Sequence, residues 1–459
     1  MKNKESILAE LNEFISYPTI SSDDKNKQAI LQCAKWLARH FKSIGMQKAE
    51  IYRTSSHPVV YAEYITDLSL KTILFYGHYD VQPIDPIEKW HTLPFKAVIR
   101  ENYIYGRGSS DDKGQLFIHV KAIESLLKKN ERLPVNVKFL IEGSEEIGSK
   151  GLKEFIASNK NLLSCDVVVV SDTKMASINV PAISYSLRGS LNAEIFVQTL
   201  KKDLHSGTFG SCVPNAAITL SNLISRLHYS DNSIAIPGFY NDVEEVTISE
   251  RKFMKLNGPS NESLLHDAEI INDWGEKNYS MNERTTIRPS LSVTGFTSGF
   301  QGKGVKNVIP SIASVKLNFR LVPKQNPGKI KLLFNNFIKQ ALPANISVKV
   351  MYSSFANPVT VLRNSPYIKA AVKAYENVFR QKVKLIRSGG TIAAVDYLNT
   401  ILNIPVVLMG FAQVSDNMHA PNEKMYVPNF FKGIDTSIQF IRNVATIPNK
   451  ITLHATAHY

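Results

Sequence analysis

Short apolar runs alternate with stretches of helical periodicity in both end regions of this chain. The runs cover residues 72–76, 135–141, 167–170 and 404–409, and helical patterns occur at 114–128 and 151–159. Strands that alternate with helices predict a largely parallel sheet, because the crossover helices cover both sheet faces. Two more amphipathic patterns, at 5–16 and 27–44, predict helices that cover this sheet.

The pattern changes between about residues 187 and 356. Strand patterns at 190–200, 289–294, 313–321 and 345–352 mix there with helical patterns at 214–228 and 328–341. The α/β pattern then resumes with a helix near 366–380. Because 459 residues exceed the size of one ordinary core, we expect a domain made of 1–186 and 357–459, interrupted by an α+β domain at 187–356. Segment 230–285 has weak periodicity and receives no assignment.

Composition narrows the class of protein. With 44% apolar and 20% charged residues, the chain is an ordinary globular protein. The net charge of +14 is scattered, which favours a solvated basic surface over nucleic-acid binding. No apolar run approaches the roughly 20 residues of a membrane span, and no signal peptide is visible. We therefore expect a cytoplasmic protein without membrane or nucleic-acid partners. The cysteines, Cys33, Cys165 and Cys212, lack CxxC spacing and are interpreted as small buried residues.

Acidic and histidine side chains follow each apolar run of the α/β part. In open α/β sheets, ligands bind at the edge where parallel strands end. A pair of adjacent glutamates is the most informative of these groups, because one carboxylate can bind a metal while the other accepts a proton from water. The residues at these positions are His78, Asp80, Glu145, Glu146, Asp172 and His419.

A glycine-rich loop adds another carboxylate. Residues 106–114 read GRGSSDDKG and lead into a helical pattern. A phosphate-binding loop is the competing interpretation, but the spacing of a P-loop is missing and two aspartates would repel a phosphate. We therefore add Asp111 to the candidate ligands.

Each candidate ligand also has an ordinary structural explanation. A single histidine is often only hydrogen-bonded, and Asp111 or Asp172 could cap a helix. Capping does not explain why these side chains recur at strand ends of one sheet. Two histidines and three carboxylates without sulfur suit Zn²⁺, Mn²⁺ or Co²⁺, and they are enough for two ions if one carboxylate bridges.

Five ordered motifs resemble the M20 family of di-zinc metallopeptidases, and most closely its carnosinase-like cytosolic dipeptidases. They are GHYDVQP at 77–83, GRGSSDDKG at 106–114, EGSEEIGS at 142–149, SDTK at 171–174 and NMHAPNE at 417–423. The resemblance implies an α/β, phosphorylase/hydrolase-like catalytic domain with a mixed, largely parallel central sheet. An α+β lid and dimerisation domain would interrupt it.

The resemblance also implies a role for each ligand. Asp111 would bridge two divalent ions, expected to be Zn²⁺, with Mn²⁺ or Co²⁺ as alternatives. His78 and Asp172 would complete one metal site, and Glu146 and His419 the other.

Two further carboxylates receive roles from the same resemblance. Glu145 would be the general base, and Asp80 would orient the ring of His78. An aspartate two residues further along an extended segment projects to the same side, which agrees with that orienting role.

Residues of the interrupting domain are implied to recognise substrate. His205, in KKDLHSGTFG at 201–210, would reach the partner subunit's active site and stabilise the oxyanion. Asn307 and Arg320 would contact substrate, with the arginine binding a terminal carboxylate. Thr391 follows two glycines at a helix start, a backbone arrangement that suits an anion; the animal dipeptidases of the family have serine there. A loop-capping histidine and a surface arginine are the alternatives.

The resulting hypothesis is a metal-dependent dipeptidase that acts as a homodimer on small peptides. The alternative is a carboxypeptidase or an aminoacylase/deacylase that acts on N-acyl amino acids. A binding protein that has lost the chemistry is disfavoured, because every ligand and the base are present.

Overall fold

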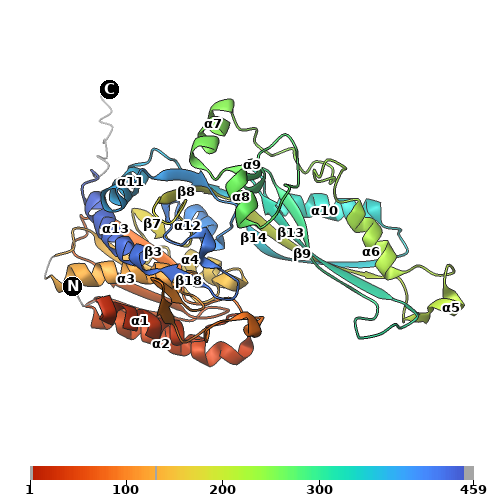
Figure 1. The fold of residues 1–459 in the computed structure, drawn as a ribbon, viewed down its shortest axis with the longest axis horizontal. Helices are drawn as coiled ribbons and strands as arrows, with labels where there is room; N and C mark the ends of the chain where they lie inside the picture. Colours follow the sequence, from red (N-terminus) through yellow and green to blue (C-terminus); the bar gives the residue numbers. More distant parts are fainter. Residues whose placement is uncertain (1–3, 130–131, 449–459) are drawn as a thin grey trace, which may run out of the picture. The chain divides into compact units, whose positions relative to one another are not determined.

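The computed structural model describes residues 4–129 and 132–448, which form two compact units (Figure 1). Unit 1 combines the chain through Tyr185 with Val361–Ile386 and the chain from Tyr397 onward. Unit 2 combines Ser186–Thr360 with Arg387–Asp396. The assignment of catalytic and lid roles to 1–186, 357–459 and 187–356 stays a prediction, because contacts define compactness and not role.

The main sheet has the strand order β1-β2-β6-β3-β7-β17-β8-β15, with β16 also paired to β8. Its central strands β6, β3, β7 and β17 are parallel to their neighbours in that run, and the outer pairs are antiparallel. The predicted α/β fold with a mixed, largely parallel sheet is confirmed. The strands are β1 Lys48–Tyr52, β2 Val59–Tyr64, β3 Thr72–His78, β6 Asn136–Glu142, β7 Val167–Val170, β8 Ala182–Leu187, β15 Val359–Thr360, β16 Lys384–Arg387 and β17 Val406–Met409.

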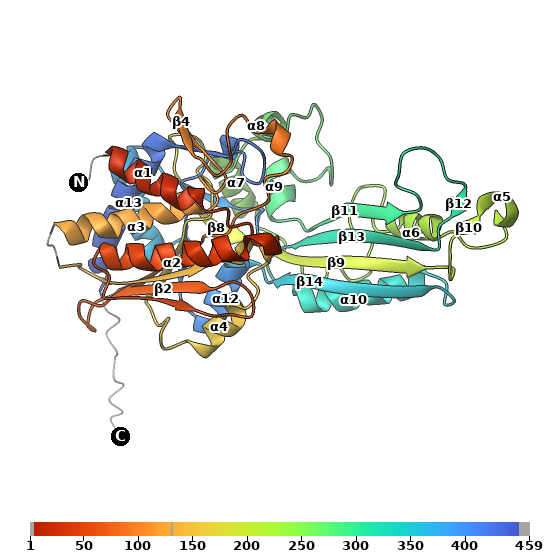
Figure 2. The same cartoon turned by 90° about the horizontal axis from the view of Figure 1, so that it is seen from below.

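Helices cover the central strands on both faces. Every residue of β6 and β7 is buried. This explains why β7 is a continuous apolar run, whereas β6 also buries Asn136, Lys138 and Glu142. Figure 2 shows α1, α2 and α3 on one side of β2 and α4 on the other. The helices are α1 Lys4–Ser16, α2 Lys27–Ser43, α3 Lys113–Lys128, α4 Leu152–Ser158, α11 Pro366–Phe379, α12 Ala393–Leu402, which begins in unit 2, and α13 Val427–Ala445.

The core of unit 1 follows from the periodicity of its elements. In α2, Ile30, Leu37 and Phe41 recur at helical spacing and are fully buried. Alternate strand residues such as Phe75 and Phe139 join the same cluster. A small sheet of order β18-β5-β4 adds β4 Val98–Arg100, β5 Tyr103–Tyr105 and β18 Lys424–Tyr426.

Unit 2 is built on an antiparallel sheet of order β11-β13-β9-β14. Burial alternates along β9 and β13, because one face packs against α6 and α10. Segment 230–285 contains α7 and α8 and most of α9. The elements are β9 Gly189–Gln198, β10 Leu204–His205, β11 Ser290–Ser298, β12 Val308–Ile309, β13 Ile312–Leu321, β14 Ser347–Ala356, α5 Ser206–Phe209, α6 Ala216–Ser225, α7 Ile248–Asn257, α8 Asn261–Asp267, α9 Met281–Thr286 and α10 Pro327–Ala341.

The cysteines differ in exposure. Cys33 and Cys165 are buried as expected, but Cys212 is exposed, so its interpretation as a buried residue is wrong. The cause is its position in a turn between α5 and α6, outside any apolar pattern. Within residues 4–129 and 132–448, none of the helices combines the length and apolar character that a membrane crossing requires.

Candidate active site

Four parallel strands of unit 1 deliver the candidate ligands to one edge of the sheet. His78 is the last residue of β3, and Asp172 lies just beyond β7. Glu145 and Glu146 occupy a short 3-10 turn after β6. His419 lies in the loop after β17. Because parallel strands end at a common edge, residues far apart in sequence meet there.

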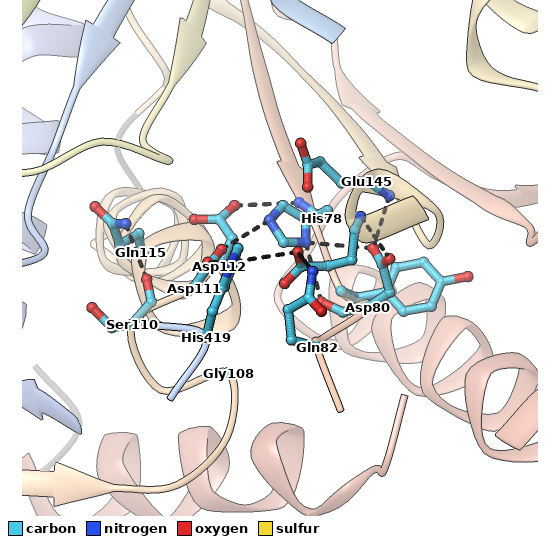
Figure 3. A network of polar contacts seen from close by, with 12 residues as sticks. His78, Asp80, Gln82, Gly108, Ser110, Asp111, Asp112, Gln115, Glu145 and His419 are labelled. Atoms are coloured by element: carbon cyan, nitrogen blue, oxygen red, sulfur yellow. Dashed lines mark hydrogen bonds and ion pairs between the residues drawn. The ribbon is translucent and has the colours of Figure 1, made fainter. Parts of the chain in front are cut away.

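The candidate ligands form two groups that share Asp111. Figure 3 shows Asp111 between His78 and His419. In one group, Asp111 lies with His78 and Asp172; in the other, it lies with Glu146 and His419. The ligand atoms of each group lie within 4.8 Å of one another. Oδ1 of Asp111 is 3.2 Å from Nε2 of His78, and Oδ2 is 2.7 Å from Nε2 of His419. Each oxygen of Asp111 therefore faces a different histidine.

The carboxylate of Asp80 supports the turn that carries both glutamates. Its two oxygens accept the backbone N–H groups of Glu145 and Glu146, each at 3.1 Å. Nδ1 of His78 lies 3.1 Å from the carbonyl oxygen of Asp80 and 3.4 Å from its carboxylate. Asp80 thus contacts the histidine ring and the glutamate turn at once. Gln82, two residues further on, donates to Oε2 of Glu146 at 2.8 Å.

Burial and crowding shift the acid–base behaviour of these groups. Burial, together with the nearby Glu146 and Asp111, raises the pKa of Glu145 well above its usual value. Burial and Asp111 likewise raise the pKa of Asp172. Burial would lower the pKa of His78, but Asp111 and Asp80 outweigh it and raise that pKa. A bound cation would offset the cost of burying several carboxylates together.

Two buried atoms fit a metal ion. Nε2 of His78 lies 3.2 Å from Oδ1 of Asp111 but makes no hydrogen bond of normal geometry, and Oε1 of Glu146 has no hydrogen-bond partner among the described residues. Buried polar atoms are normally paired, and both atoms belong to side chains of the two groups that share Asp111. The set of imidazole nitrogens and carboxylate oxygens is one that Zn²⁺, Mn²⁺ and Co²⁺ accept.

Helix capping does not account for these aspartates. The N-cap of α3 is Asp112, whose side chain makes no capping hydrogen bond. Asp112 instead accepts the backbone N–H of His78 at 3.2 Å, and burial and Asp111 raise its pKa to about 8. Asp172 lies in a loop.

Sequence reasoning missed several residues that hold this site. Asp112 and Glu423 stood inside the recognised motifs but received no role. Gln115, on α3, donates to the carbonyl of Ser110 and accepts the backbone N–H groups of Phe411 and Ala412. A glutamine at the start of a predicted helix was the available signal, but Phe411 and Ala412 lie about 300 positions away.

The predicted substrate residues lie in unit 2 at two separate places. Nη1 of Arg320 donates to Oγ1 of Thr391 at 2.8 Å. His205 is exposed in β10. Ser206, which follows His205, donates its backbone N–H to the carbonyl of Asn307. β10 and Asn307 adjoin the start of β13, whereas Arg320 lies near its end. At about 3.3 Å per residue, these places are roughly 25 Å apart.

A second arginine accompanies Arg320. Nε of Arg188 donates to the carbonyl of Gly389 at 2.9 Å, and its backbone carbonyl accepts the hydroxyl of Thr391 at 2.7 Å. Burial, and then the charge of Arg320, lower the pKa of Arg188 to about 10. No role for Arg188 was predicted from the sequence, because its contact with residues 389–391 spans about 200 positions.

Residues 74–443 match peptidase family M20/M25/M40, and this span contains both ligand groups and Glu145. The chain belongs to this family. The predicted family is thereby confirmed, and the solved structures of relatives confirm the fold class.

Named relatives cover nearly the whole chain. The Cys-Gly metallodipeptidase of Schizosaccharomyces pombe is 29% identical over 97% of both chains. The human Beta-Ala-His dipeptidase is 30% identical over 85% of this chain and 78% of its own length. Among solved structures, an M20 family metallo-carboxypeptidase from Sulfolobus solfataricus is 34% identical, covers 97% of this chain and 100% of its own, and has a TM-score of 0.89.

Proposed function

We propose that this protein is a metal-dependent dipeptidase. The observation that carries the proposal is the pair of ligand groups that share Asp111, with Glu145 adjacent in sequence to one of the ligands. Similarity to the Cys-Gly and Beta-Ala-His dipeptidases supports dipeptides as the substrate class. Among the described residues, neither ligand group includes Glu145, so its carboxylate is available for proton transfer.

His78, Asp111 and Asp172 would hold one divalent ion, and Asp111, Glu146 and His419 the other. The ions would polarise the amide carbonyl and make water more acidic, and Zn²⁺ is the first candidate. Nε2 of His78 and Oε1 of Glu146, which are buried and make no hydrogen bond to the described residues, support this assignment.

Glu145 would carry the proton. Burial raises its pKa, and a raised pKa helps a carboxylate to hold the proton that it takes from water. In the proposed reaction it accepts a proton from the attacking water and returns it to the departing amine. Asp80 accepts the backbone N–H of Glu145 and so fixes the backbone position from which the Glu145 side chain extends.

Arg320 and Thr391 would bind the C-terminal carboxylate of the peptide. The guanidinium of Arg320 already contacts the hydroxyl of Thr391, so the two side chains lie together. That hydroxyl donates to the backbone carbonyl of Arg188, and it would turn to the carboxylate when the peptide binds. The half-buried Arg188 beside them adds a second positive charge that favours a carboxylate.

His205 would act across a homodimer. It lies roughly 25 Å from Arg320 by strand rise, so the two cannot contact one substrate within unit 2 of a single chain. Donation to the oxyanion would therefore come from His205 of a second copy. The cytoplasmic location expected from the sequence stays a prediction.

A carboxypeptidase is the second candidate, because the Sulfolobus solfataricus structure of that type is similar over nearly the entire chain. The deciding experiment compares unblocked dipeptides, N-acetylated amino acids and longer peptides, with added Zn²⁺ or Mn²⁺. A dipeptidase should release amino acids from unblocked dipeptides. Cleavage confined to longer peptides or acylated substrates would replace the dipeptidase assignment with the alternative.

A further inference from the structure

The loop that carries Asp111 is held by hydrogen bonds to a carboxylate near the far end of the chain. Glu423 is fully buried and accepts four hydrogen bonds from residues 107–111. Its Oε1 accepts the backbone N–H groups of Ser110 and Asp111 at 2.9 and 3.0 Å. Its Oε2 accepts the N–H of Gly108 at 2.9 Å and Nη1 of Arg107 at 2.8 Å.

One short segment therefore holds Asp111 from two directions. Within residues 417–423, His419 lies 2.7 Å from the Asp111 carboxylate, and Glu423 binds the Asp111 backbone N–H. The side chain of Asp111 leaves the backbone at the point that Glu423 fixes. A shift of the loop would move both carboxylate oxygens relative to the two histidines.

Arg107 extends this attachment to the strand end that carries His78. Its Nη2 donates to the carbonyl of Pro83 at 2.8 Å. The loop also passes close to this segment, because a Cβ on Gly108 would come within 2.8 Å of Cγ1 of Val81. Gly108 has a φ of +86°, so only glycine adopts this conformation without strain. Little space remains for the loop to take another position.

We propose that Glu423 is a positioning residue for the dinuclear metal site, which it serves by fixing the loop that presents Asp111 to both ions. This inference rests on the proposed function. Outer residues that orient metal ligands typically change metal affinity by about 10–100-fold when mutated. Glu423 is predicted to act in this way through backbone N–H groups and not through a ligand side chain.

Glu423→Gln is the diagnostic substitution. The amide keeps the size of the side chain but turns one acceptor oxygen into an NH₂ group. Either oxygen position faces two donors, so whichever orientation glutamine adopts, two N–H groups lose their acceptor. The loop should relax, and the Asp111 carboxylate should lose its fixed direction.

Glu283→Gln is the matched control. Glu283 is also buried, and it accepts two hydrogen bonds from Arg251 and the backbone N–H of Ser280, but it lies in unit 2. Its substitution removes a buried carboxylate that binds an arginine, without touching the loop at 106–111. The side chain of Arg251 is 41% exposed, whereas that of Arg107 is buried. A general loss of stability would affect both variants, whereas a loss of positioning would affect only Glu423→Gln.

The test is a titration of the full-length metal-free proteins with Zn²⁺ alone against a competing chromophoric chelator. We expect Glu423→Gln to bind Zn²⁺ at least tenfold more weakly than wild type, Glu283→Gln to stay within about twofold, and excess Zn²⁺ to restore part of the lost kcat. Wild-type affinity in folded Glu423→Gln, or an equal loss in Glu283→Gln, would overturn the inference.

If Glu423→Gln does not fold, Glu423→Asp decides. It keeps the charge but withdraws the carboxylate by one methylene, so an intermediate loss of Zn²⁺ affinity is expected and an unchanged affinity overturns the inference. A wild-type protein that binds no Zn²⁺ would overturn the proposed function as well. That result is distinct from the failure of Glu423 alone.

Discussion

Asp172→Asn should make the metal-free protein more stable and the metal-loaded protein less stable than wild type. Asp172 is crowded by the charge of Asp111, and their ligand oxygens lie within 4.8 Å. At 4.8 Å and an effective dielectric constant near 20, the repulsion between two full charges is about 3.5 kcal/mol. Attraction to His78 and partial exposure of Asp172 reduce the net value. Relief of about 1 kcal/mol in the metal-free protein is therefore expected.

Bound metal reverses the effect of Asp172→Asn on stability. An ion at 100 times its Kd stabilises the folded state by about 2.7 kcal/mol, and Asp172→Asn should lose most of this stabilisation at one site. Calorimetric unfolding with excess chelator, and then with saturating Zn²⁺, measures both states.

Asp166→Asn provides the control from the opposite end of β7. Asp166 accepts the N–H of Thr72 at 2.8 Å and pairs with Lys71 at 3.2 Å, so its substitution should destabilise the protein with or without metal. Two results would refute the reasoning. In one, Asp172→Asn is less stable than wild type in chelator; in the other, Zn²⁺ stabilises Asp172→Asn as much as it stabilises wild type.

Two further predictions concern pH and the glutamate turn. Burial lowers the pKa of His119 to about 3, against about 6.5 when unfolded; wild-type stability should therefore fall as pH drops below about 6.5, by up to about 1.4 kcal/mol per unit. Urea unfolding between pH 5 and 7.5 should show a shallower dependence for His119→Gln, and equal slopes would contradict the burial argument. Asp80→Asn should lower kcat by about 10–100-fold in steady-state assays, because one of two backbone N–H groups in the glutamate turn loses its acceptor; an unchanged kcat would show that this support is dispensable.

The sequence predicted the central strands because burial on both faces leaves a continuous apolar signal. β7 was predicted at its observed bounds, and β3 and β6 within two residues. Strands β1 and β4 were not predicted, because their residues are largely exposed or half-buried. Segment 230–285 gave no assignment for a related reason: α7 buries only Met254, and α8 buries none of its residues.

The candidate ligands could be named from sequence because strand ends and motifs mark them. The residues that hold these ligands in place could not be named in this way. Glu423 and Gly108 are 315 positions apart, and no local pattern indicates that a buried carboxylate will accept distant backbone N–H groups. The double contact of Asp80 likewise depends on where the turn after β6 falls beside the end of β3.

The most direct test of the proposed chemistry is turnover by Glu145→Gln with its metal content measured in the same sample. The amide keeps the shape of the side chain but cannot accept and return a proton. We expect two metal ions per chain, as in wild type, and a kcat for an unblocked dipeptide reduced by about 10²–10⁴-fold. A metal-loaded Glu145→Gln with near wild-type kcat would contradict the assignment of Glu145 as the proton carrier.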